Sequence, residues 1–259
     1  MPEISLSEKP TAVAGIIPAA GLSSRMQAFK PLLGIAGRPL LLWTLTSLAA
    51  GGVDHLELIL GYQASAVKTQ LEGWPTPSKN RQNPNSAAPS TRAKAQESSQ
   101  QAAQAPAPAP SMHITVNHDY ATSDMLHSLQ LGLEQLLFDP HSYTAACILP
   151  GDIAAIAPAS IRALLAAHRR TPEQTLRLSY AGQCGHPLLA PRSLWTTIVN
   201  FNGSGGLRAA LAQTNILDIP VDDPGVLLDA DNAADLARLE SQLLDRLNEG
   251  EDRADFSTL

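Results

Sequence analysis

The chain has 259 residues, enough to bury a substantial core in one large α/β domain or two small ones. Its 44% hydrophobic content is ordinary for a globular protein, and its formal net charge of −6 argues against a general nucleic-acid binder, which needs a basic face. No apolar stretch approaches the roughly 20 residues of a membrane span. The opening MPEISLSEKP lacks the charged-then-apolar order of a signal peptide, so a cytoplasmic location is expected.

Short apolar runs alternate with helical patterns along the chain. Strands are predicted at 11–17, 55–61, 113–117, 145–152, 175–181, 186–190 and 215–221. Helices are predicted within 38–52, 65–73, 125–137 and 158–170, from Gly206 onward, and after the stretch 225–231. This alternation indicates an α/β fold with a mostly parallel sheet and helices on both of its faces.

One segment interrupts the alternation. From about Gly73 to Ser111 the chain is rich in Pro, Ala, Ser, Gln and Asn and ends in QQAAQAPAPAP. Such a stretch has little to bury, so we predict a disordered insertion, with a partner-binding linker as the alternative. The prediction is a single domain over 11–248 that the insertion interrupts, with flexible termini at 1–10 and 249–259.

The loop after the first predicted strand contains PAAGLSSRM and then a lysine. In parallel α/β sheets ligands bind where strands end and helices begin. Small residues there expose backbone N–H groups to phosphate oxygens, Arg25 offers a planar fork, and Lys30 offers a compact charge. The alternative is a connecting loop with two surface cations. Neither G-x-x-x-x-G-K-[ST] nor G-x-G-x-x-G is present.

Six blocks of sequence occur in an order that resembles a known family. They read AAGLSSRMQAFKPLL, NHDYATSDMLHSLQLGL, LPGDIAAIAP, CGHPLLAP, GSGGLRAAL and GVLLDADNAADLARL. Together they resemble the MobA-like NTP transferase superfamily, whose first block reads LAAGxSSRMGxxK, and within it the molybdenum cofactor cytidylyltransferases. The resemblance implies a Rossmann-like, three-layer αβα (GT-A-like) nucleotidyltransferase fold.

The same resemblance implies roles for individual residues. It assigns nucleotide binding to Ala19, Ala20, Gly21, Leu22, Ser23, Ser24, Arg25, Lys30 and Gly61, with Arg25, Lys30 and Asp152 as the catalytic set. It assigns Mg²⁺ to Asp152 and Asp229, with Asp231 as a further candidate. It places Met125, Ser128, Gly185, His186 and Pro187 on the acceptor side.

The implied reaction moves CMP from CTP to the terminal phosphate of molybdopterin cofactor and releases pyrophosphate. Magnesium and positioned cations suit this chemistry, because two anions must approach each other and no covalent intermediate is needed. Magnesium takes one or two protein carboxylates, so two separated aspartates suit it. A molybdoenzyme or its maturation chaperone is the implied protein partner, and neither nucleic acid nor membrane is expected.

Other interpretations stay open at this level. Taken alone, Asp152 and Asp229 could each cap a helix and His186 could be structural. The sequence departs from the family at Gln27 and Asp124, where glycine is usual, and at Ala154, where proline is usual. The same fold serves guanylyl transfer and transfer to sugar phosphates, and a non-catalytic nucleotide-binding protein is a further alternative. A zinc site at Cys184 and His186 is disfavoured, because zinc usually needs three or four protein ligands. A serine hydrolase is disfavoured because the sequence has no G-x-S-x-G elbow.

Overall fold

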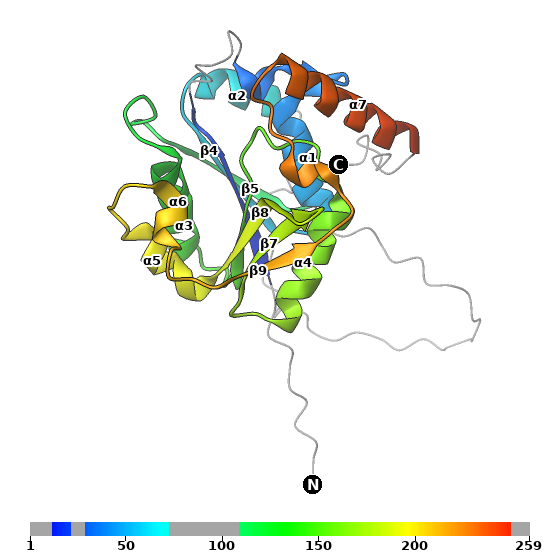
Figure 1. Ribbon diagram of the computed structural model, residues 1–259. Helices are drawn as coiled ribbons and strands as arrows, with labels where there is room; N and C mark the ends of the chain where they lie inside the picture. Colours follow the sequence, from blue (N-terminus) through cyan, green and yellow to red (C-terminus); the bar gives the residue numbers. More distant parts are fainter. Residues whose placement is uncertain (1–11, 22–28, 73–108, 250–259) are drawn as a thin grey trace, which may run out of the picture.

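The computed structural model describes residues 12–21, 29–72 and 109–249, and a seven-stranded sheet runs through this part of the chain (Figure 1). The strand order is β5–β4–β1–β6–β8–β7–β9. These strands are β1 (Val13–Ala19), β4 (His55–Leu60), β5 (Ser111–Val116), β6 (Ala145–Ile148), β7 (Thr175–Tyr180), β8 (Gln183–Pro191) and β9 (Ile216–Pro220). A separate two-stranded ribbon pairs β2 (Gly34–Ile35) with β3 (Arg38–Pro39).

Helices fill the connections between the strands. The α-helices are α1 (Leu40–Gly51), α2 (Ala64–Leu71), α3 (Met125–Phe138), α4 (Pro158–Arg170), α5 (Trp195–Val199), α6 (Gly206–Ala210) and α7 (Ala233–Glu249). The 3₁₀ turns are η1 (Lys30–Leu32), η2 (Arg192–Leu194) and η3 (Pro224–Leu227). None of the described helices is long and apolar enough to cross a membrane.

The sheet is mostly parallel, as the strand–helix alternation predicts. Strands β5, β4, β1 and β6 pair in parallel, and β9 pairs in parallel with β7. Strand β8 is the exception, since it runs antiparallel to both β6 and β7. Two residues, Ala181 and Gly182, connect β7 to β8, with φ of 49° and 77°. Two consecutive positive φ angles make the tight turn that joins antiparallel neighbours.

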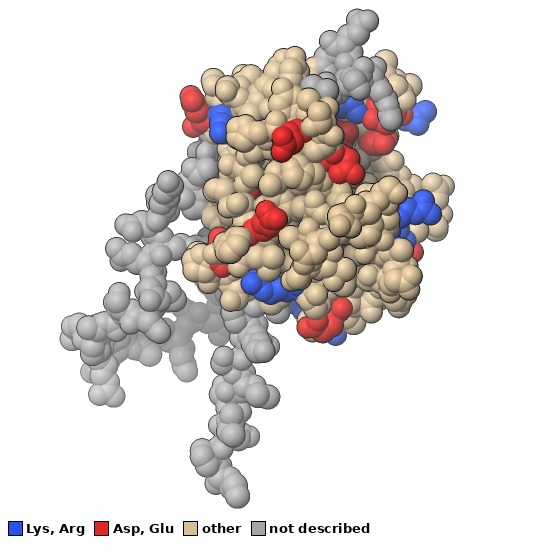
Figure 2. All heavy atoms as spheres, turned by 90° about the vertical axis from the view of Figure 1, so that its left-hand side faces the viewer, with Lys and Arg blue, Asp and Glu red and all other residues tan. Residues whose placement is uncertain are grey.

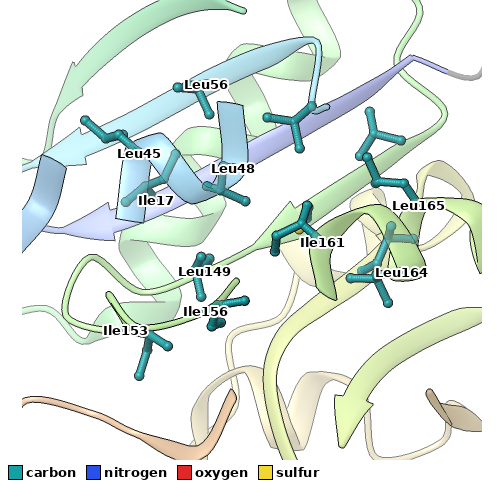
Figure 3. Packing of buried hydrophobic residues seen from close by; sticks show 14 of the residues in the cluster. Ile17, Leu45, Leu48, Leu56, Leu149, Ile153, Ile156, Ile161, Leu164 and Leu165 are labelled. Carbon is teal, nitrogen blue, oxygen red and sulfur yellow. The ribbon is translucent and has the colours of Figure 1, made fainter. Parts of the chain in front are cut away.

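Apolar residues cover both faces of the sheet. On one face, α1 and α4 pack against β1, β4 and β6 through a large cluster that includes Ile17, Leu45 and Ile161 (Figure 3). On the other face, α3 and α5 pack through a second cluster around Leu129 and Trp195. Each such buried side chain contributes roughly 1.5–3 kcal/mol of transfer free energy. The predicted three layers of helix, sheet and helix are therefore confirmed.

Strand boundaries differ from those expected, and three of the differences bear on the site or on the insertion. Strand β1 begins at Val13 and continues to Ala19, because its last residues still pair with β4. Strand β5 begins at Ser111, which pairs with His55, so this residue belongs to the sheet and not to the insertion. Strand β6 ends at Ile148, four residues before Asp152. The rest of the predicted insertion, except residues 109 and 110, lies outside the described residues.

Candidate functional site

The carboxyl ends of the parallel strands surround a pocket of about 370 Å³. Its size is typical of small-molecule sites, and its place at the strand ends is where open α/β sheets bind ligands. The residues that line it are Pro18, Ala19, Ala20, Gly21, Lys30, Pro31, Asn117, Tyr120, Ser123, Asp124, Met125, Ser128, Pro150, Gly151, Asp152 and Asp231.

Lys30 connects two of the predicted metal ligands in this pocket. Its Nζ donates hydrogen bonds to Asp231 Oδ1 at 2.7 Å and to Asp152 Oδ2 at 3.3 Å. The lysine is buried, whereas each carboxylate keeps about a third of its side chain exposed. Burial lowers the pKa of Lys30, but hydrogen bonding and charge attraction from Asp231 and Asp152 outweigh it and raise the pKa above its ordinary value. Lys30 is therefore a cation at neutral pH.

The segment after β6 holds Asp152 against the end of β1. Gly151 N donates to Pro18 O at 3.1 Å, which extends the pairing of the two strands beyond β6. On the other side, the buried Thr44 hydroxyl lies 3.3 Å from the carbonyl oxygens of Gly151 and Ile153. The backbone on both sides of Asp152 is therefore held in place. Helix α4 begins only at Pro158, so Asp152 does not cap it.

Asp231 is positioned by the start of α7. The next residue, Asn232, accepts hydrogen bonds from Ala234 N and Asp235 N through its Oδ1, at 2.9 and 3.0 Å. This is the helix cap that Asp229 could have provided. Further along α7, Arg246 donates from Nη1 to Ala155 O at 2.8 Å and ties the helix to the segment after β6. Asp231 thus reaches Lys30 from the residues just before a helix that is attached to the segment after β6.

Asp229 lies near the same charges but does not line the pocket. Its side chain is largely exposed, but the part that is buried raises its pKa above the ordinary value. The negative charges of Asp231 and Asp152 raise the pKa further, and a backbone hydrogen bond opposes them. This repulsion among the aspartates is the kind that a bound cation relieves. Of the two candidates beyond Asp152, the structure thus brings Asp231 into contact with Lys30 and leaves Asp229 beside the pair.

The predicted acceptor residues fall in two groups. Met125 and Ser128 line the pocket from the first turn of α3. Gly185, His186 and Pro187 lie in β8, outside the pocket lining. Burial lowers the pKa of His186, which also experiences the charges of Asp152 and Asp229, so this residue lies close to the carboxylates.

Two of the predicted glycines have a close-packing role. A Cβ on Gly61 would lie 2.5 Å from Tyr120 Cβ and 2.6 Å from Ala20 O, so glycine lets the segments after β4, β5 and β1 meet. A Cβ on Gly185 would collide with the backbone of Val226 in η3. Of the predicted nucleotide-binding set, Leu22, Ser23, Ser24 and Arg25 lie outside the described residues, as does Gln27.

The sequence analysis missed several lining residues, including Asn117, Tyr120, Ser123 and Gly151. Asn117 immediately follows β5. Polar residues that follow parallel strands gather at one edge of the sheet. This rule directed attention to the loop after β1, and it would also have identified Asn117.

The charge of the lining is unbalanced. Within the described residues it carries the carboxylates of Asp124, Asp152 and Asp231 and the one cation of Lys30. Figure 2 shows a face of the molecule where acidic and basic side chains are scattered over a largely uncharged surface. Local charges in the pocket therefore decide which ligands it can hold, and a polyphosphate needs further cations there.

A magnesium ion fits this donor set. In the described part of the chain, no group of three or more His, Cys, Asp or Glu side chains is gathered so as to hold a metal unaided. Magnesium does not need one, because phosphate oxygens and waters complete its coordination around one or two carboxylates. Asp152 and Asp231 provide two carboxylates that already converge on a single positive charge.

Similar folds occur in known proteins. Rv0371c from Mycobacterium tuberculosis H37Rv is 23% identical with a TM-score of 0.62, over 89% of this chain and 98% of that one. A second structure of it is a complex with manganese. The nucleotidyl transferase Mth528 from Methanothermobacter is 17% identical with a TM-score of 0.65, over 90% and 98% of the two chains.

Sequence comparison identifies the family directly. The bifunctional protein GlmU of Pelobacter propionicus is 41% identical over 63 residues, which are 24% of this chain and only 14% of that protein. The family model described as the MobA-like NTP transferase domain matches residues 15–218, which include the β1 loop, Lys30 and Asp152. The chain therefore belongs to the MobA-like NTP transferase family and has its nucleotidyltransferase fold.

Proposed function

We propose that the protein transfers CMP from CTP to the terminal phosphate of molybdopterin cofactor, with release of pyrophosphate. The observation that carries the proposal is the convergence of Lys30, Asp152 and Asp231 in the pocket at the end of β1. These three residues come from distant parts of the chain and meet in the pocket at the strand ends. Membership of the NTP transferase family supports the reaction class.

In the reaction, an oxygen of the acceptor phosphate forms a bond to the α-phosphorus of CTP. The bond from the α-phosphorus to the bridging oxygen breaks, and pyrophosphate leaves with the electron pair. Lys30 stays protonated and lies where it can neutralise phosphate charge, and we propose that Arg25 acts with it. The backbone of Ala19, Ala20 and Gly21 gives the phosphates close access to the end of β1.

Asp152 and Asp231 are the proposed magnesium ligands, with Asp229 adding negative charge nearby. When bound, magnesium would neutralise phosphate oxygens and stabilise the charge that grows on pyrophosphate. The manganese complex of Rv0371c supports a divalent metal in this fold. His186 and its neighbours in β8 are proposed to meet the acceptor, and a molybdoenzyme or its maturation chaperone is the proposed recipient of the product.

The test is a matrix of substrates. The protein is incubated with magnesium, each of the four nucleoside triphosphates, and either molybdenum cofactor or a sugar phosphate, and pyrophosphate release is measured. The proposal expects release with CTP and molybdenum cofactor. Release only with a sugar phosphate would contradict the acceptor, release only with GTP would contradict the nucleotide, and binding without any release would indicate a non-catalytic nucleotide-binding protein.

A further inference from the structure

The N-terminus of α3 meets the pocket and is capped by an acidic side chain. Helix α3 begins at Met125, and the preceding Asp124 accepts a hydrogen bond from His127 N to its Oδ1 at 3.1 Å. Asp124 and Met125 both line the pocket. One carboxylate oxygen is thus engaged with the helix, and the side chain adds a negative charge to the wall of the pocket.

This cap determines what the α3 end of the pocket can hold. Open helix N-termini bind phosphate, because their first N–H groups and the helix dipole favour an anion. Here the carboxylate of Asp124 already supplies that anion. A phosphate placed beside it would meet a like charge, so the phosphates belong with Lys30 at the end of β1. The α3 end is left for an uncharged part of a substrate.

The neighbouring polar groups show which hydrogen bonds that part can make. Asn117 is buried and donates from Nδ2 to Ser123 Oγ at 3.0 Å and to Ser128 Oγ at 3.1 Å. Both serines also line the pocket, and a serine hydroxyl that accepts a hydrogen bond still has a proton to donate. The Asp124 carboxylate, by contrast, only accepts. Tyr120 also lines the pocket, and an aromatic side chain is a group on which a planar ring can stack.

We propose that Asp124 is a specificity-determining residue that selects a planar ring carrying an amino group next to a ring acceptor. The amino group donates to Asp124, and the ring acceptor faces the serine hydroxyls. A ring with a carbonyl in place of the amino group would set its oxygen against the carboxylate and bind less tightly. This inference rests on the proposed function, and two substrates of that reaction carry such a ring: the cytosine of CTP and the pterin of the acceptor.

The experiment compares pairs of ligands that differ in the amino group. Dissociation constants are measured by calorimetry for CTP against UTP and for pterin against lumazine. The wild-type protein and Asp124→Asn, Asp124→Ser and Asp124→Gly are used. Asn and Ser keep a helix cap without the charge, whereas Gly removes the side chain. Wild type should prefer the amino-bearing member of one pair at least tenfold, and Asn and Ser should reduce that preference at least fivefold. The ligand pair whose preference changes shows whether the ring beside Asp124 is the base of CTP or the pterin of the acceptor.

A second measurement uses inorganic pyrophosphate as the probe. It should bind Asp124→Gly several-fold more tightly than wild type, because the α3 N-terminus is then open to an anion. The inference is overturned if wild type prefers neither amino-bearing ligand, or if Asn and Ser change both preferences less than twofold while melting like wild type. Failure of the proposed function is a separate result, namely normal ligand preferences without release of pyrophosphate from any substrate pair.

Discussion

Lys30 Nζ lies 2.7 Å from Asp231 Oδ1, although the two residues are 201 positions apart in the chain. The same amine reaches Asp152 at 3.3 Å. A single positive charge thus offsets two carboxylates that come from the segment after β6 and from the approach to α7. Because magnesium would bind those carboxylates in the proposed reaction, Lys30 and the metal compete for the same negative charge until phosphates arrive.

This competition predicts the effect of Lys30→Met on metal binding. Removal of the cation takes away the positive charge that Asp152 and Asp231 share, so Mn²⁺ should bind the nucleotide-free protein roughly tenfold more tightly. The effect is moderate because solvent screens carboxylates that are a third exposed. Calorimetric titration with MnCl₂ measures it. Lys30→Arg keeps the charge and serves as the control, with affinity close to wild type; weaker binding to Lys30→Met would show that the lysine does not oppose the metal.

Gly185→Ala is expected to destabilise the protein. The new Cβ would collide with the Val226 backbone, so η3 or β8 must shift, at a cost of about 1–3 kcal/mol. The matched control is Gly34→Ala, where a Cβ meets nothing within 4 Å and stability should change by less than about 0.5 kcal/mol. Urea unfolding of the two variants gives both values. Equal stability of Gly185→Ala and wild type would contradict a packing role for this glycine.

His168 predicts a pH dependence of stability away from the pocket. It is buried in α4, and burial, helped by Arg169 and opposed by Glu173, lowers its pKa. The folded state therefore holds it neutral, whereas the unfolded chain takes up a proton near the ordinary pKa of about 6.5. Its contribution to the free energy of unfolding is then complete above pH 6.5 and falls as the pH drops below that value.

The variant His168→Gln removes this titration. Between pH 7.5 and 5.5 its free energy of unfolding should fall less than that of wild type, as measured by urea denaturation at each pH. His118→Gln, which changes a histidine exposed at the surface, is the matched control. A slope in His168→Gln as steep as that of wild type would mean that other groups cause the loss of stability.

The sequence predicts most of the sheet, because apolar runs followed by turn residues have few structural alternatives. It does not predict the direction of β8, which depends on the two-residue turn at Ala181 and Gly182. It also misses α5, a single turn of five residues that is too short to show a helical period. Trp195 at its start is buried by packing against the sheet, and its indole donates to Ala190 O at 3.1 Å, so tertiary contacts position this helix.

The site is predicted in outline and less well in detail. Motif order indicates Lys30 and Asp152, and it favours Asp229 over Asp231 as the second carboxylate. In the structure the cap is Asn232, so α7 begins at Ala233 and the preceding Asp231 lies beside Lys30. Gly61 and Gly185 resemble binding residues in sequence, yet their surroundings show close backbone packing, which becomes visible only when distant segments are brought together.

The central claim is that the residues around Lys30 form a metal-dependent nucleotidyl transfer site, and Asp152→Asn tests it most directly. This change keeps the size of the side chain and removes its charge. Turnover is measured as pyrophosphate release with CTP, magnesium and molybdenum cofactor, with thermal unfolding as a check of folding. The account predicts a fall of at least about a hundredfold in a folded variant, since loss of one electrostatic stabiliser has that effect. Turnover equal to that of wild type would contradict it.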